Sequence, residues 1–564
     1  MEQDMNNQTS DKTLLSIEDL TVRLPEGADR DNAVENISFQ VNRGEILCIV
    51  GESGSGKSVT ANAIMGLLPR PYVEPVAGRI VFEGRDLLQL PEATLRDLRG
   101  SRVGMIFQEP MTALNPVMKI GDQINEVFDA HGKAGRKERK EQVVELLRSV
   151  GLPDPESLGD SYPFRLSGGQ RQRVMIAMAL ALEPGVLIAD EPTTALDVTT
   201  QAQILRLIRK LQDDRDMGVM FITHDFGVVA EVADQVAVMQ LGEVVESGPA
   251  QEILNNPQHP YTQRLVGSVP RFEPPEARGK LSAETLLSVR SLDKTYVTAR
   301  GLFTKGRTVQ AAKSVSFDIR KGETMGLVGE SGSGKSTVGR CIVRLLESNG
   351  GEIRFRDEID LASLKGRGLQ PYRKHIQMIF QDPYASLNPR RKVGRIIAEG
   401  PMAHGTSQAE AHRRAEELLE LVGLDSAVAD RYPHEFSGGQ RQRIGIARAL
   451  ALDPELLVAD EPVSALDVSV QAQVLDLLDD IKQRLNISVL FITHDLRVAA
   501  QICERIAVMQ LGEIVEYGDT REVFSNPQHP YTRELLAAVP GRNWSIPEVA
   551  RKAVADQQLQ KEVL

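Results

Sequence analysis

The sequence predicts an α/β protein made of two similar halves, each built around a mostly parallel β-sheet. The first observation is a repeat, because GESGSGKS occurs at residues 51–58 and again at 329–336. The second is that four later segments also return, each 270 positions further on and with no more than one change. The third is that short apolar runs alternate with helical patterns, which is typical of parallel strands joined by helices.

The later repeats show that the whole half is duplicated, and not the glycine-rich loop alone. They are LSGGQRQR at 166–173 with FSGGQRQR at 436–443, ADEP at 189–192 and 459–462, FITHD at 221–225 and 491–495, and NPQHPYT at 256–262 and 526–532. Two homologous domains in tandem are therefore expected.

Composition and pattern suggest where these domains begin and end. The expected parts are a polar N-terminal tail (1–13), a first domain (14–270), a linker (271–285), a second domain (286–545) and a charged C-terminal tail (546–564). The linker carries RFEPPEARGK, whose proline, glycine and charge content is typical of an exposed connection. Amphipathic patterns at about 120–160 and 393–430 predict a helical subdomain inserted in each domain.

Apolar runs of strand length stand before the polar motifs of the first half. Residues 46–50 precede the glycine-rich loop, 186–189 lead into Asp190, and 219–223 lead into His224. Such runs suit strands buried on both faces of a parallel sheet. We therefore expect the polar residues at the strand ends, where open α/β sheets bind ligands.

Charge and composition narrow the possible functions. The chain has 564 residues, 66 of them basic and 78 acidic, for a net charge of −12. An acidic protein without a Lys/Arg block lacks the electrostatic footprint of a non-specific nucleic-acid binder, and no nucleic-acid partner is expected. The cysteines Cys48, Cys341 and Cys503 lie far apart, which indicates buried thiols in a reducing compartment and no disulfide framework.

No segment is expected to cross a membrane. The N-terminal residues MEQDMNNQTSDK are polar, which argues against a signal peptide. The most apolar stretch, 174–189, is interrupted by Glu183, Pro184 and Gly185, and a spanning helix needs about 20 apolar residues. A location in the cytoplasm follows.

The glycine-rich loops predict phosphate binding. A G-x-x-x-x-G-K-[ST] loop between a strand and a helix turns its backbone N–H groups toward an anion, while Lys57 or Lys335 reaches the β and γ phosphates and Ser58 or Ser336 ligates Mg²⁺. The expected nucleotide-binding residues are Gly51, Ser53, Gly54, Gly56, Lys57, Ser58 and Val59 in the first copy and Gly329, Ser331, Gly332, Gly334, Lys335, Ser336 and Thr337 in the second.

Polar residues at later strand ends suggest hydrolysis. One carboxylate of each Asp-Glu pair would hold Mg²⁺, and the next would polarise an attacking water. The expected catalytic residues are Glu191, His224, Glu461 and His494, and the expected metal-site residues are Ser58, Gln108, Asp190, Ser336, Gln381 and Asp460. Any one of these residues alone could be a helix cap, a solvated turn or a satisfied strand end. Their combined occurrence, twice over, favours catalysis.

The SGGQ segments supply a second phosphate-binding loop in each half. Each precedes an apolar helical pattern, as an anion site at a helix N-terminus requires. The residues concerned are Ser167, Gly168 and Gly169, and Ser437, Gly438 and Gly439.

In this order, twice, the motifs resemble the ATP-binding cassette (ABC) family over nearly the full chain: Walker A, Gln loop, LSGGQ signature, Walker B, ALD loop (195–197 and 465–467) and switch histidine. The resemblance implies two tandem P-loop NTPase domains that pack head to tail. Each ATP would lie between the Walker A loop of one half and the signature of the other. Both sites keep the glutamate and the histidine, so both are expected to hydrolyse ATP.

Finer features resemble the two ATP-binding subunits of oligopeptide and dipeptide permeases, fused into one chain. They are FQEPMTALNP at 107–116, FQDPYASLNPR at 380–390 and the paired NPQHPYT segments. HPYT could equally be a packing turn, and no catalytic role is expected for it.

This resemblance implies an ATPase that energises an importer from the cytoplasmic face of the inner membrane. Its partners would be two integral membrane permease subunits and an extracytoplasmic solute-binding protein, and it would not touch the cargo. Peptides are the expected cargo, with nickel, glutathione or another small solute as alternatives. A soluble twin-cassette protein acting on ribosomes or DNA is disfavoured, because the expected linker is short and contains proline.

Two departures distinguish the predicted sites. Alignment of 14–24 with 286–296 puts Leu24 opposite Tyr296, where the family usually places an aromatic ring against adenine. The first site is therefore expected to bind adenine more weakly, by about 0.5–1.5 kcal/mol, the scale of one aromatic contact. Arg165 precedes the first signature and is expected to add a positive charge near the phosphates of the second site.

Overall fold

A computed structural model describes residues 12–109, 113–132, 136–194, 196–272, 282–297, 308–464 and 466–563. The chain divides into two compact units, and each is described here by itself. The first consists of Met1–Leu196, Thr200–Val269 and Pro540–Leu564, and the second of Asp197–Thr199 and Pro270–Val539.

The first unit contains two sheets. One is antiparallel with strand order β2-β1-β4-β5, and the other has order β10-β9-β3-β8-β7-β6. In the larger sheet the strands from β9 to β6 run parallel, and β10 pairs antiparallel with β9. The strands are β1 (Thr13–Arg23), β2 (Asn32–Asn42), β3 (Ile46–Val50), β4 (Glu74–Phe82), β5 (Arg85–Asp86), β6 (Val103–Ile106), β7 (Val186–Asp190), β8 (Gly218–Thr223), β9 (Gln235–Gln240) and β10 (Glu243–Pro249).

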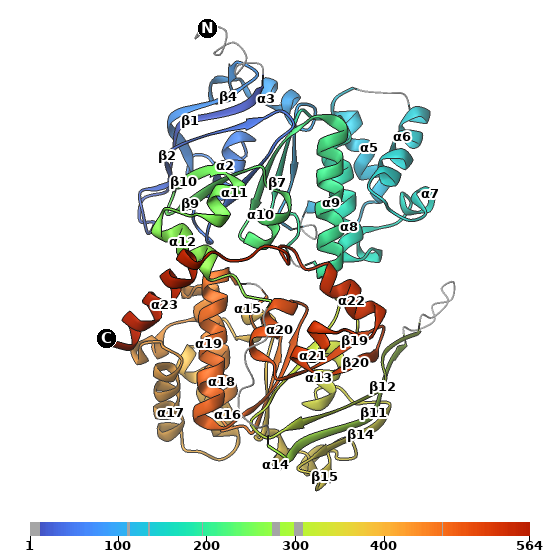
Figure 1. The fold of residues 1–564 in the computed structure, drawn as a ribbon, viewed down its shortest axis with the longest axis vertical. Helices are drawn as coiled ribbons and strands as arrows, with labels where there is room; N and C mark the ends of the chain where they lie inside the picture. Colours follow the sequence, from blue (N-terminus) through green and yellow to red (C-terminus); the bar gives the residue numbers. More distant parts are fainter. Residues whose placement is uncertain are drawn as a thin grey trace. The chain divides into compact units, whose positions relative to one another are not determined.

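Helices surround these sheets. They are α2 (Lys57–Ile64), η1 (Leu87–Gln89), α3 (Glu92–Leu98), α5 (Ile120–Ala130), α6 (Arg136–Ser149), α7 (Pro155–Leu158), η2 (Pro163–Arg165), α8 (Gly168–Ala179), α9 (Val198–Arg215), α10 (Phe226–Val232), α11 (Ala250–Asn255), α12 (Pro260–Gly267) and α23 (Glu548–Val563). In Figure 1, α5, α6 and α7 lie together on one side of this unit, and strands β1, β2 and β4 lie on the other. This group is the expected helical subdomain, and its apolar residues Ile120, Ile124 and Phe128 are buried at helical spacing.

The second unit repeats the two sheets, with orders β12-β11-β14-β15 and β16-β17-β18-β13-β19-β20. Its strands are β11 (Thr285–Val297), β12 (Thr308–Arg320), β13 (Thr324–Val328), β14 (Gly350–Phe355), β15 (Ile359–Asp360), β16 (Ile376–Ile379), β17 (Leu456–Asp460), β18 (Ser488–Thr493), β19 (Arg505–Gln510) and β20 (Glu513–Asp519). Its helices are α13 (Lys335–Ile342), η3 (Gly366–Gly368), α14 (Gln370–Arg373), α15 (Pro383–Ser386), α16 (Val393–Ala403), α17 (Gln408–Leu421), η4 (Ser426–Asp430), η5 (Pro433–Glu435), α18 (Gly438–Leu450), α19 (Val468–Leu485), α20 (Leu496–Ile502), α21 (Thr520–Ser525) and α22 (Pro530–Ala537).

The central parallel strands are the most deeply buried elements. Every residue of β3, β7 and β8 is buried, as is every residue of β13, β17 and β18. This agrees with the sequence pattern, since a parallel sheet with both faces covered needs apolar side chains in both directions. Polar residues follow at the ends of these strands, and they are therefore anchored to the most deeply buried part of each unit.

The C-terminal segment differs from the charged tail that the sequence predicts. Residues from Glu548 onward form helix α23, which packs against α12 in the first unit. Ala550 is fully buried there, and a Cβ atom on Gly267 would lie 2.3 Å from the Ala550 carbonyl oxygen. The bare glycine therefore lets the two helix backbones come close. The expected second domain extended to residue 545, whereas the second unit ends at Val539.

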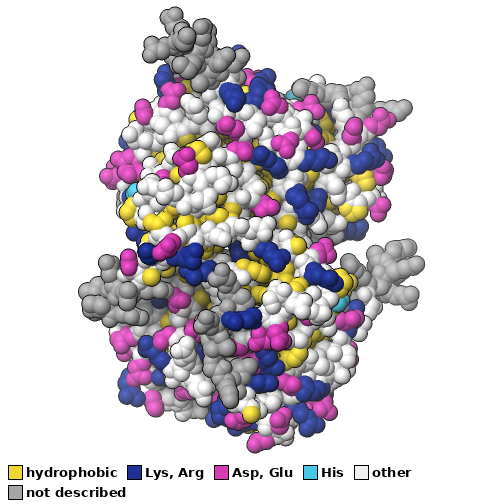
Figure 2. Space-filling model, viewed as in Figure 1, with side chains coloured by type: hydrophobic (Ala, Val, Ile, Leu, Met, Phe, Trp, Pro, Cys, Tyr) yellow, Lys and Arg dark blue, Asp and Glu magenta, His cyan; other side chains and the backbone are white. Residues whose placement is uncertain are grey.

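The surface and the cysteines agree with the composition. Figure 2 shows acidic and basic side chains interspersed over the face in view. Cys48, Cys341 and Cys503 are buried free thiols, and burial raises the pKa of the Cys48 and Cys503 thiols. Within the described ranges, every helix is too short or too polar to span a bilayer.

Candidate functional site

The glycine-rich loop of the first unit connects β3 to α2. Lys57, the first residue of α2, is 5% exposed, and its Nζ donates hydrogen bonds to the carbonyl oxygens of Gly51 (2.7 Å) and Glu52 (2.8 Å). Gly51 has φ 155°, and a Cβ atom there would lie 2.2 Å from the carbonyl oxygen of Met239 in β9. Glycine is therefore required at Gly51, and the loop holds a buried ammonium group at the predicted phosphate site.

The second unit repeats this arrangement. Lys335 donates to the carbonyl oxygens of Gly329 (2.8 Å) and Glu330 (2.7 Å). Burial lowers the pKa of Lys335, and the nearby carboxylates oppose that shift. A phosphate group would supply the negative charge that favours the ammonium form.

Each unit places a serine hydroxyl against a buried aspartate. Ser58 Oγ donates to Asp190 Oδ1 at 3.1 Å, and Ser336 Oγ donates to Asp460 Oδ1 at 2.7 Å. Burial raises the pKa of Asp190 to about 6, against the hydrogen bond from Ser58. Burial also raises the pKa of Asp460, whose Oδ2 is buried without a hydrogen-bond partner and lies 3.8 Å from Arg340.

These oxygen atoms fit Mg²⁺. Mg²⁺ prefers oxygen ligands and is commonly held by one or two carboxylates together with water and substrate phosphates. In the part of the chain that the structure describes, no group of three or more His, Cys, Asp or Glu side chains could hold a metal ion. A metal at this site would therefore need ligands from a bound nucleotide or from water.

Glu191 lies at the centre of a polar cluster in the first unit. His224 Nδ1 lies 3.3 Å from Glu191 Oε1, while Gln108 Nε2 and Thr194 Oγ1 donate to Glu191 Oε2 at 3.0 and 2.9 Å. Burial alone would raise the pKa of Glu191, but its hydrogen bonds with His224 and Thr194 and the positive charges of His224 and Lys57 lower it to about 2. Glu191 is therefore an ionised carboxylate, able to accept a hydrogen bond from an attacking water.

The second cluster also has a glutamate at its centre, but its contacts differ in detail. Glu461 Oε2 lies 3.1 Å from His494 Nδ1 and accepts from Gln381 Nε2 at 2.8 Å. Burial disfavours the charged imidazole, but the Glu461 carboxylate raises the pKa of His494 above its ordinary value. Ser464, which corresponds to Thr194, donates instead to the main-chain oxygen of Glu461 at 3.2 Å. The two carboxylates are therefore held differently.

Sheet order explains why these residues meet. Strands β3, β8 and β7 are neighbours and run parallel, so the glycine-rich loop, His224 and Asp190 all stand at one edge of the sheet. Gln108 joins them because β6 pairs with β7. Residues far apart in the sequence are brought together by this strand order, as is usual for ligand sites in open α/β sheets.

The signature residues lie on a separate element of each unit, at the N-terminus of α8 or α18. Ser167 Oγ accepts from Gln170 N at 3.3 Å, and Gln170 Oε1 accepts from Ser167 N at 3.0 Å. Ser437 and Gln440 make the same pair of bonds. This capping box fixes the start of the helix, and a helix N-terminus favours an anion.

Comparison with known proteins agrees with this geometry. A family model described as ABC transporter matches residues 34–194 and 312–464. The chain belongs to the ABC transporter family. A second model, described as the oligopeptide/dipeptide transporter C-terminal region, matches residues 245–294 and 515–559. The α/β fold and the ATPase class expected from the sequence are thereby confirmed, since ABC cassettes bind ATP and hydrolyse it to power transport.

Several relatives match over nearly the whole chain. The glutathione import ATP-binding protein GsiA of Salmonella choleraesuis (strain SC-B67) is 48% identical over 566 residues, which cover 95% of this chain and 91% of the relative. The GsiA protein of Escherichia coli (strain K12) is 49% identical over 558 residues, covering 93% and 89%. Among solved structures, the dimeric post-hydrolysis state of the ATP-binding cassette MJ0796 bound to ADP and Pi is 31% identical, covers 42% of this chain and 99% of that one, and has a TM-score of 0.38.

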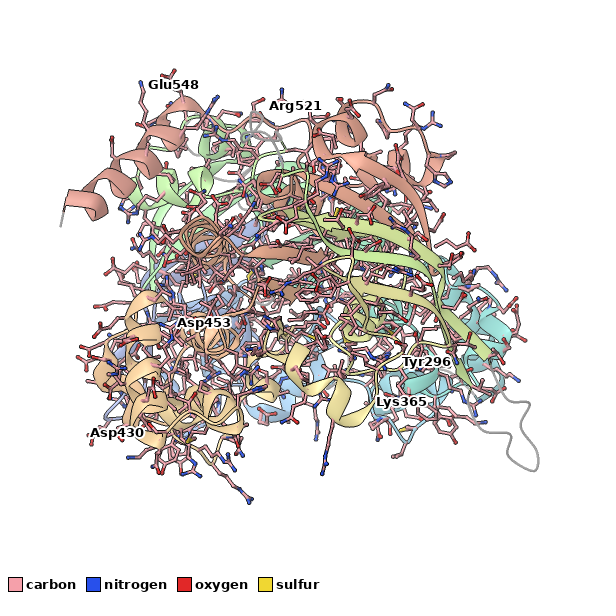
Figure 3. The ribbon with its side chains drawn as sticks, turned by 90° about the horizontal axis from the view of Figure 1, so that it is seen from below. Tyr296, Lys365, Asp430, Asp453, Arg521 and Glu548 are labelled. Carbon is pink, nitrogen blue, oxygen red and sulfur yellow. The ribbon has the colours of Figure 1, made fainter. Side chains whose placement is uncertain are left out.

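The expected adenine contact differs between the two cassettes. Tyr296, labelled in Figure 3 near the end of β11, has 41% of its surface exposed, and Lys294 Nζ lies 5.4 Å from its ring centroid. Leu24 is instead partly buried against the apolar core of the first cassette. The second cassette therefore has a partly exposed aromatic side chain, with a lysine ammonium over its ring, at a position where the first has a packed aliphatic side chain.

Other predicted site residues lie in the Walker A loops or in the first turns of the helices that follow them. Ser53, Gly54, Ser331 and Gly332 are exposed in the two Walker A loops, and Val59 and Thr337 lie in the first turns of α2 and α13. Of the two ALD loops, Ala195 and Ala465 lie outside the described residues.

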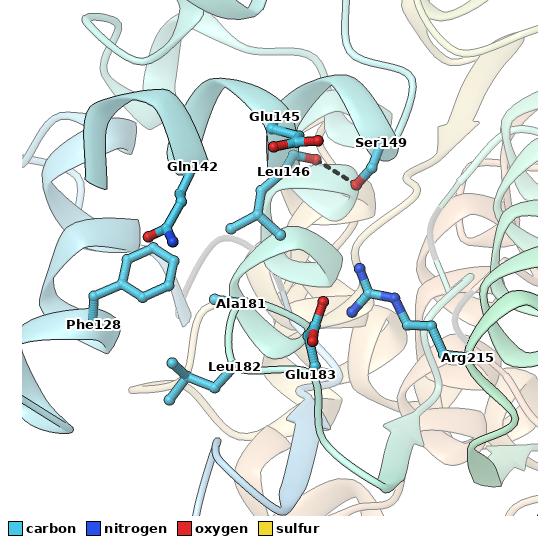
Figure 4. A pocket seen from close by; sticks show the side chains of 9 residues that line it. All are labelled: Phe128, Gln142, Glu145, Leu146, Ser149, Ala181, Leu182, Glu183 and Arg215. Atoms are coloured by element: carbon cyan, nitrogen blue, oxygen red, sulfur yellow. Dashed lines mark hydrogen bonds between the residues drawn. The ribbon is translucent and has the colours of Figure 1, made fainter. Parts of the chain in front are cut away.

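A hollow of about 450 Å³ lies on the helical subdomain of the first cassette (Figure 4). Its walls include Phe128, Leu146, Leu182 and Arg215. The lining residues include none of the nucleotide motifs, and residues 181–183 follow the end of α8 opposite to the signature. This hollow is therefore distinct from the ATP site.

The sequence alone missed two kinds of contact. Thr194 donates to the Glu191 carboxylate, and no sequence pattern singled it out. Tyr261 and Tyr531, from the repeated HPYT segments, donate to or accept from the Walker A loops. The exact repetition of the motif in both halves is the sequence feature that points to these two tyrosines.

Proposed function

We propose that this chain is the ATP-hydrolysing subunit of an importer of the oligopeptide/dipeptide class, bound peripherally at the cytoplasmic face of the inner membrane. The main observation that supports this function is that each half has a lysine, a serine, an aspartate, a glutamate and a histidine together at one edge of its parallel sheet. The oligopeptide/dipeptide C-terminal region also follows each cassette. Two integral membrane permease subunits and an extracytoplasmic solute-binding protein would complete the importer, with no nucleic-acid partner.

The proposed cargo is a small peptide, which the chain itself does not contact. Glutathione is a specific second candidate, because the relatives at 48–50% identity carry the name glutathione import ATP-binding protein. Glutathione is itself a modified tripeptide, so the two proposals differ in how narrow the specificity is.

In the proposed reaction, Lys57 exchanges its hydrogen bonds to the loop carbonyls for the phosphates of ATP. Ser58, Asp190 and Gln108 would hold Mg²⁺ in the first half, and Ser336, Asp460 and Gln381 in the second. Bound Mg²⁺ supplies charge neutralisation for phosphoryl transfer. Glu191 accepts a hydrogen bond from the attacking water and orients it, and His224 holds the carboxylate in place.

We further propose that the signature of one cassette completes the ATP site of the other. Ser437 and Gly439 would serve the site of Lys57, and Ser167 and Gly169 the site of Lys335. The family resemblance and the anion-favouring helix N-termini support this pairing. Replacing Ser437 with arginine should then abolish hydrolysis at the first Walker A while leaving its nucleotide binding measurable.

Detergent extraction and affinity purification of the chain from its own cells tests the importer proposal. Two multi-span membrane proteins should co-purify, and ATPase activity should rise when peptide-loaded or glutathione-loaded binding protein is added. Stimulation by glutathione and by no other peptide would select the second cargo. Recovery of ribosomes or DNA-repair proteins without membrane partners would contradict the transport function.

A further inference from the structure

The NPQHPYT segment of the first cassette folds into a hydrogen-bonded turn that leads into α12. The Glu246 carboxylate accepts from the backbone N–H groups of Gln258 (2.7 Å) and His259 (3.1 Å). His259 Nδ1 then accepts from the N–H of Tyr261 at 3.2 Å, and Pro260 occupies the first helical position. Glu246, His259 and Pro260 thus fix the backbone that leads into Tyr261, which is 4% exposed.

The hydroxyl group of this tyrosine reaches the phosphate-binding loop. The backbone N–H of Glu52 donates to Tyr261 Oη at 3.2 Å, and Tyr261 Oη lies 3.2 Å from Glu52 Oε2, to which it donates. The two residues are 209 positions apart in the chain. One hydroxyl therefore holds both the main chain and the side chain of the second residue of the Walker A loop.

The same loop residue also contacts the Walker A lysine. Lys57 Nζ donates to the carbonyl oxygen of Glu52 at 2.8 Å. Tyr261 holds Glu52 through its N–H and its carboxylate, and Lys57 holds it through its C=O. The position of the ammonium group is therefore tied to the position of the tyrosine hydroxyl through a single residue.

The second cassette repeats the turn and the contacts of the loop main chain with the tyrosine and the lysine. Glu516 accepts from the N–H groups of Gln528 (2.7 Å) and His529 (3.1 Å), and His529 Nδ1 accepts from Tyr531 N at 3.2 Å. The N–H of Glu330 donates to Tyr531 Oη at 3.2 Å, and Lys335 Nζ donates to the Glu330 carbonyl at 2.7 Å. Packing alone does not require a hydroxyl at these buried positions, since phenylalanine has the same ring.

We propose that Tyr261 and Tyr531 are positioning residues for ATP hydrolysis: each hydroxyl keeps Glu52 or Glu330 in place while the Walker A lysine turns from the loop carbonyls to the phosphates. Neither tyrosine touches the reacting atoms. Without the hydroxyl, Glu52 or Glu330 loses the hydrogen bond that holds it in place when the lysine side chain moves. The ammonium group is then less well placed for the transferring phosphoryl group. This inference rests on the proposed ATPase function.

The test compares Tyr261→Phe, Tyr531→Phe and the double variant in the full chain, co-purified with its membrane subunits. Loss of one or two hydrogen bonds predicts that kcat for Mg·ATP falls about 3- to 10-fold in each single variant and further in the double variant. KM for ATP should change less than about twofold, since the other loop N–H groups remain in place. Because a smaller folded fraction would also lower the apparent kcat without changing KM, kcat is calculated per folded enzyme.

Tyr517→Phe is the control for the loss of a tyrosine hydroxyl. The Tyr517 hydroxyl also hydrogen-bonds a side chain, Arg505, but this tyrosine is 39% exposed and lies in β20, outside the nucleotide motifs. This variant should keep the wild-type kcat. Thermal unfolding of all variants corrects kcat for the folded fraction.

Wild-type kcat in Tyr261→Phe and Tyr531→Phe, with wild-type ATPase intact, would overturn the positioning role and leave the proposed function standing. Absence of ATP hydrolysis by the wild-type complex would overturn both.

Discussion

At the scale of single residues, two adjacent carboxylates have opposite pKa shifts. Burial raises the pKa of Asp190 to about 6, whereas contacts with His224 and its neighbours lower that of Glu191 to about 2. Pairs of titratable groups with divergent pKa values are typical of sites that assign different tasks to similar side chains. Here the buried aspartate suits a cation, and the ionised glutamate suits an attacking water.

The raised pKa of Asp190 predicts a pH-dependent cost in the nucleotide-free protein. The folded pKa of about 6 exceeds the ordinary value of 3.8, so folding favours the protonated form. The stability contribution of Asp190 is thus present below pH 3.8 and is lost as pH rises through 6. Asp190→Asn cannot ionise, and at pH 8 its free energy of unfolding should exceed that of wild type by up to about 3 kcal/mol.

Denaturant unfolding in EDTA, without nucleotide, measures this difference at pH 8 and pH 5. The advantage of Asp190→Asn should be larger at pH 8 and smaller at pH 5. An equal advantage at both pH values, or a larger one at pH 5, would show that ionisation of Asp190 is not its cause.

The clusters around Glu191 and Glu461 predict that both sites hydrolyse ATP. Glutamine has nearly the same shape but is a poor acceptor for a water proton, so Glu191→Gln and Glu461→Gln should each lower the turnover of the purified complex. The double variant should lose at least about 100-fold. Nucleotide binding by fluorescence is the control for folding. Wild-type turnover in Glu191→Gln would show that the first site is not hydrolytic.

At the scale of elements, helix α12 has contacts at both ends. Tyr261, near its start, holds the Walker A loop, and Gly267, its last residue, packs against α23. The corresponding α22 carries Tyr531 near its start. The sequence repeat therefore preserved the loop contact in both cassettes, and the close packing of α23 is a feature of the first unit.

Close packing at Gly267 predicts sensitivity to a single methyl group. In Gly267→Ala the added Cβ would lie 2.3 Å from the Ala550 carbonyl, so α12 and α23 must separate, at a cost of about 1–3 kcal/mol. Limited proteolysis should then cleave the C-terminal helix faster than in wild type. Gly445→Ala, in α18, is the control, because a Cβ there meets nothing within 4 Å. Equal cleavage rates in all three proteins would contradict the tight helix contact.

At the scale of the whole molecule, the end of the chain belongs structurally to the first unit. Pro540–Leu564 groups with residues of the first half, although it follows the second cassette in sequence. The chain is thus two cassettes in sequence, with one C-terminal segment that stabilises the earlier one.

Deletion of residues 540–564 should therefore destabilise the first unit selectively. Hydrogen exchange followed by mass spectrometry should show faster exchange in α12 of the truncated chain, because one face of this helix loses its cover. Helix α22, the sequence counterpart in the second unit, serves as an internal control and should keep its wild-type exchange rate. Equal acceleration in α12 and α22 would argue against selective support by α23.

Much of the fold and of the candidate site could be predicted because short stretches of the sequence indicate them. Apolar runs in the sequence predict strands β3, β7 and β8. A strand buried on both faces has apolar side chains along its whole length, so it can be recognised without knowing which strands lie beside it. Lys57 and Asp190 were predictable for a related reason: their chemistry depends on short motifs at strand ends. The role of Thr194 was not, because a hydroxyl three residues beyond a carboxylate has many possible partners.

The sequence by itself determined that this protein is a tandem pair of ABC cassettes, with the residue types for ATP hydrolysis present in each half. The repeated segments and the short motifs can be recognised without knowing which distant parts of the chain come into contact. Only the tertiary structure decided that Tyr261 holds Glu52, and that the C-terminal helix packs on α12. Both are contacts between segments hundreds of residues apart, and such contacts depend on strand order and packing, which no local pattern encodes.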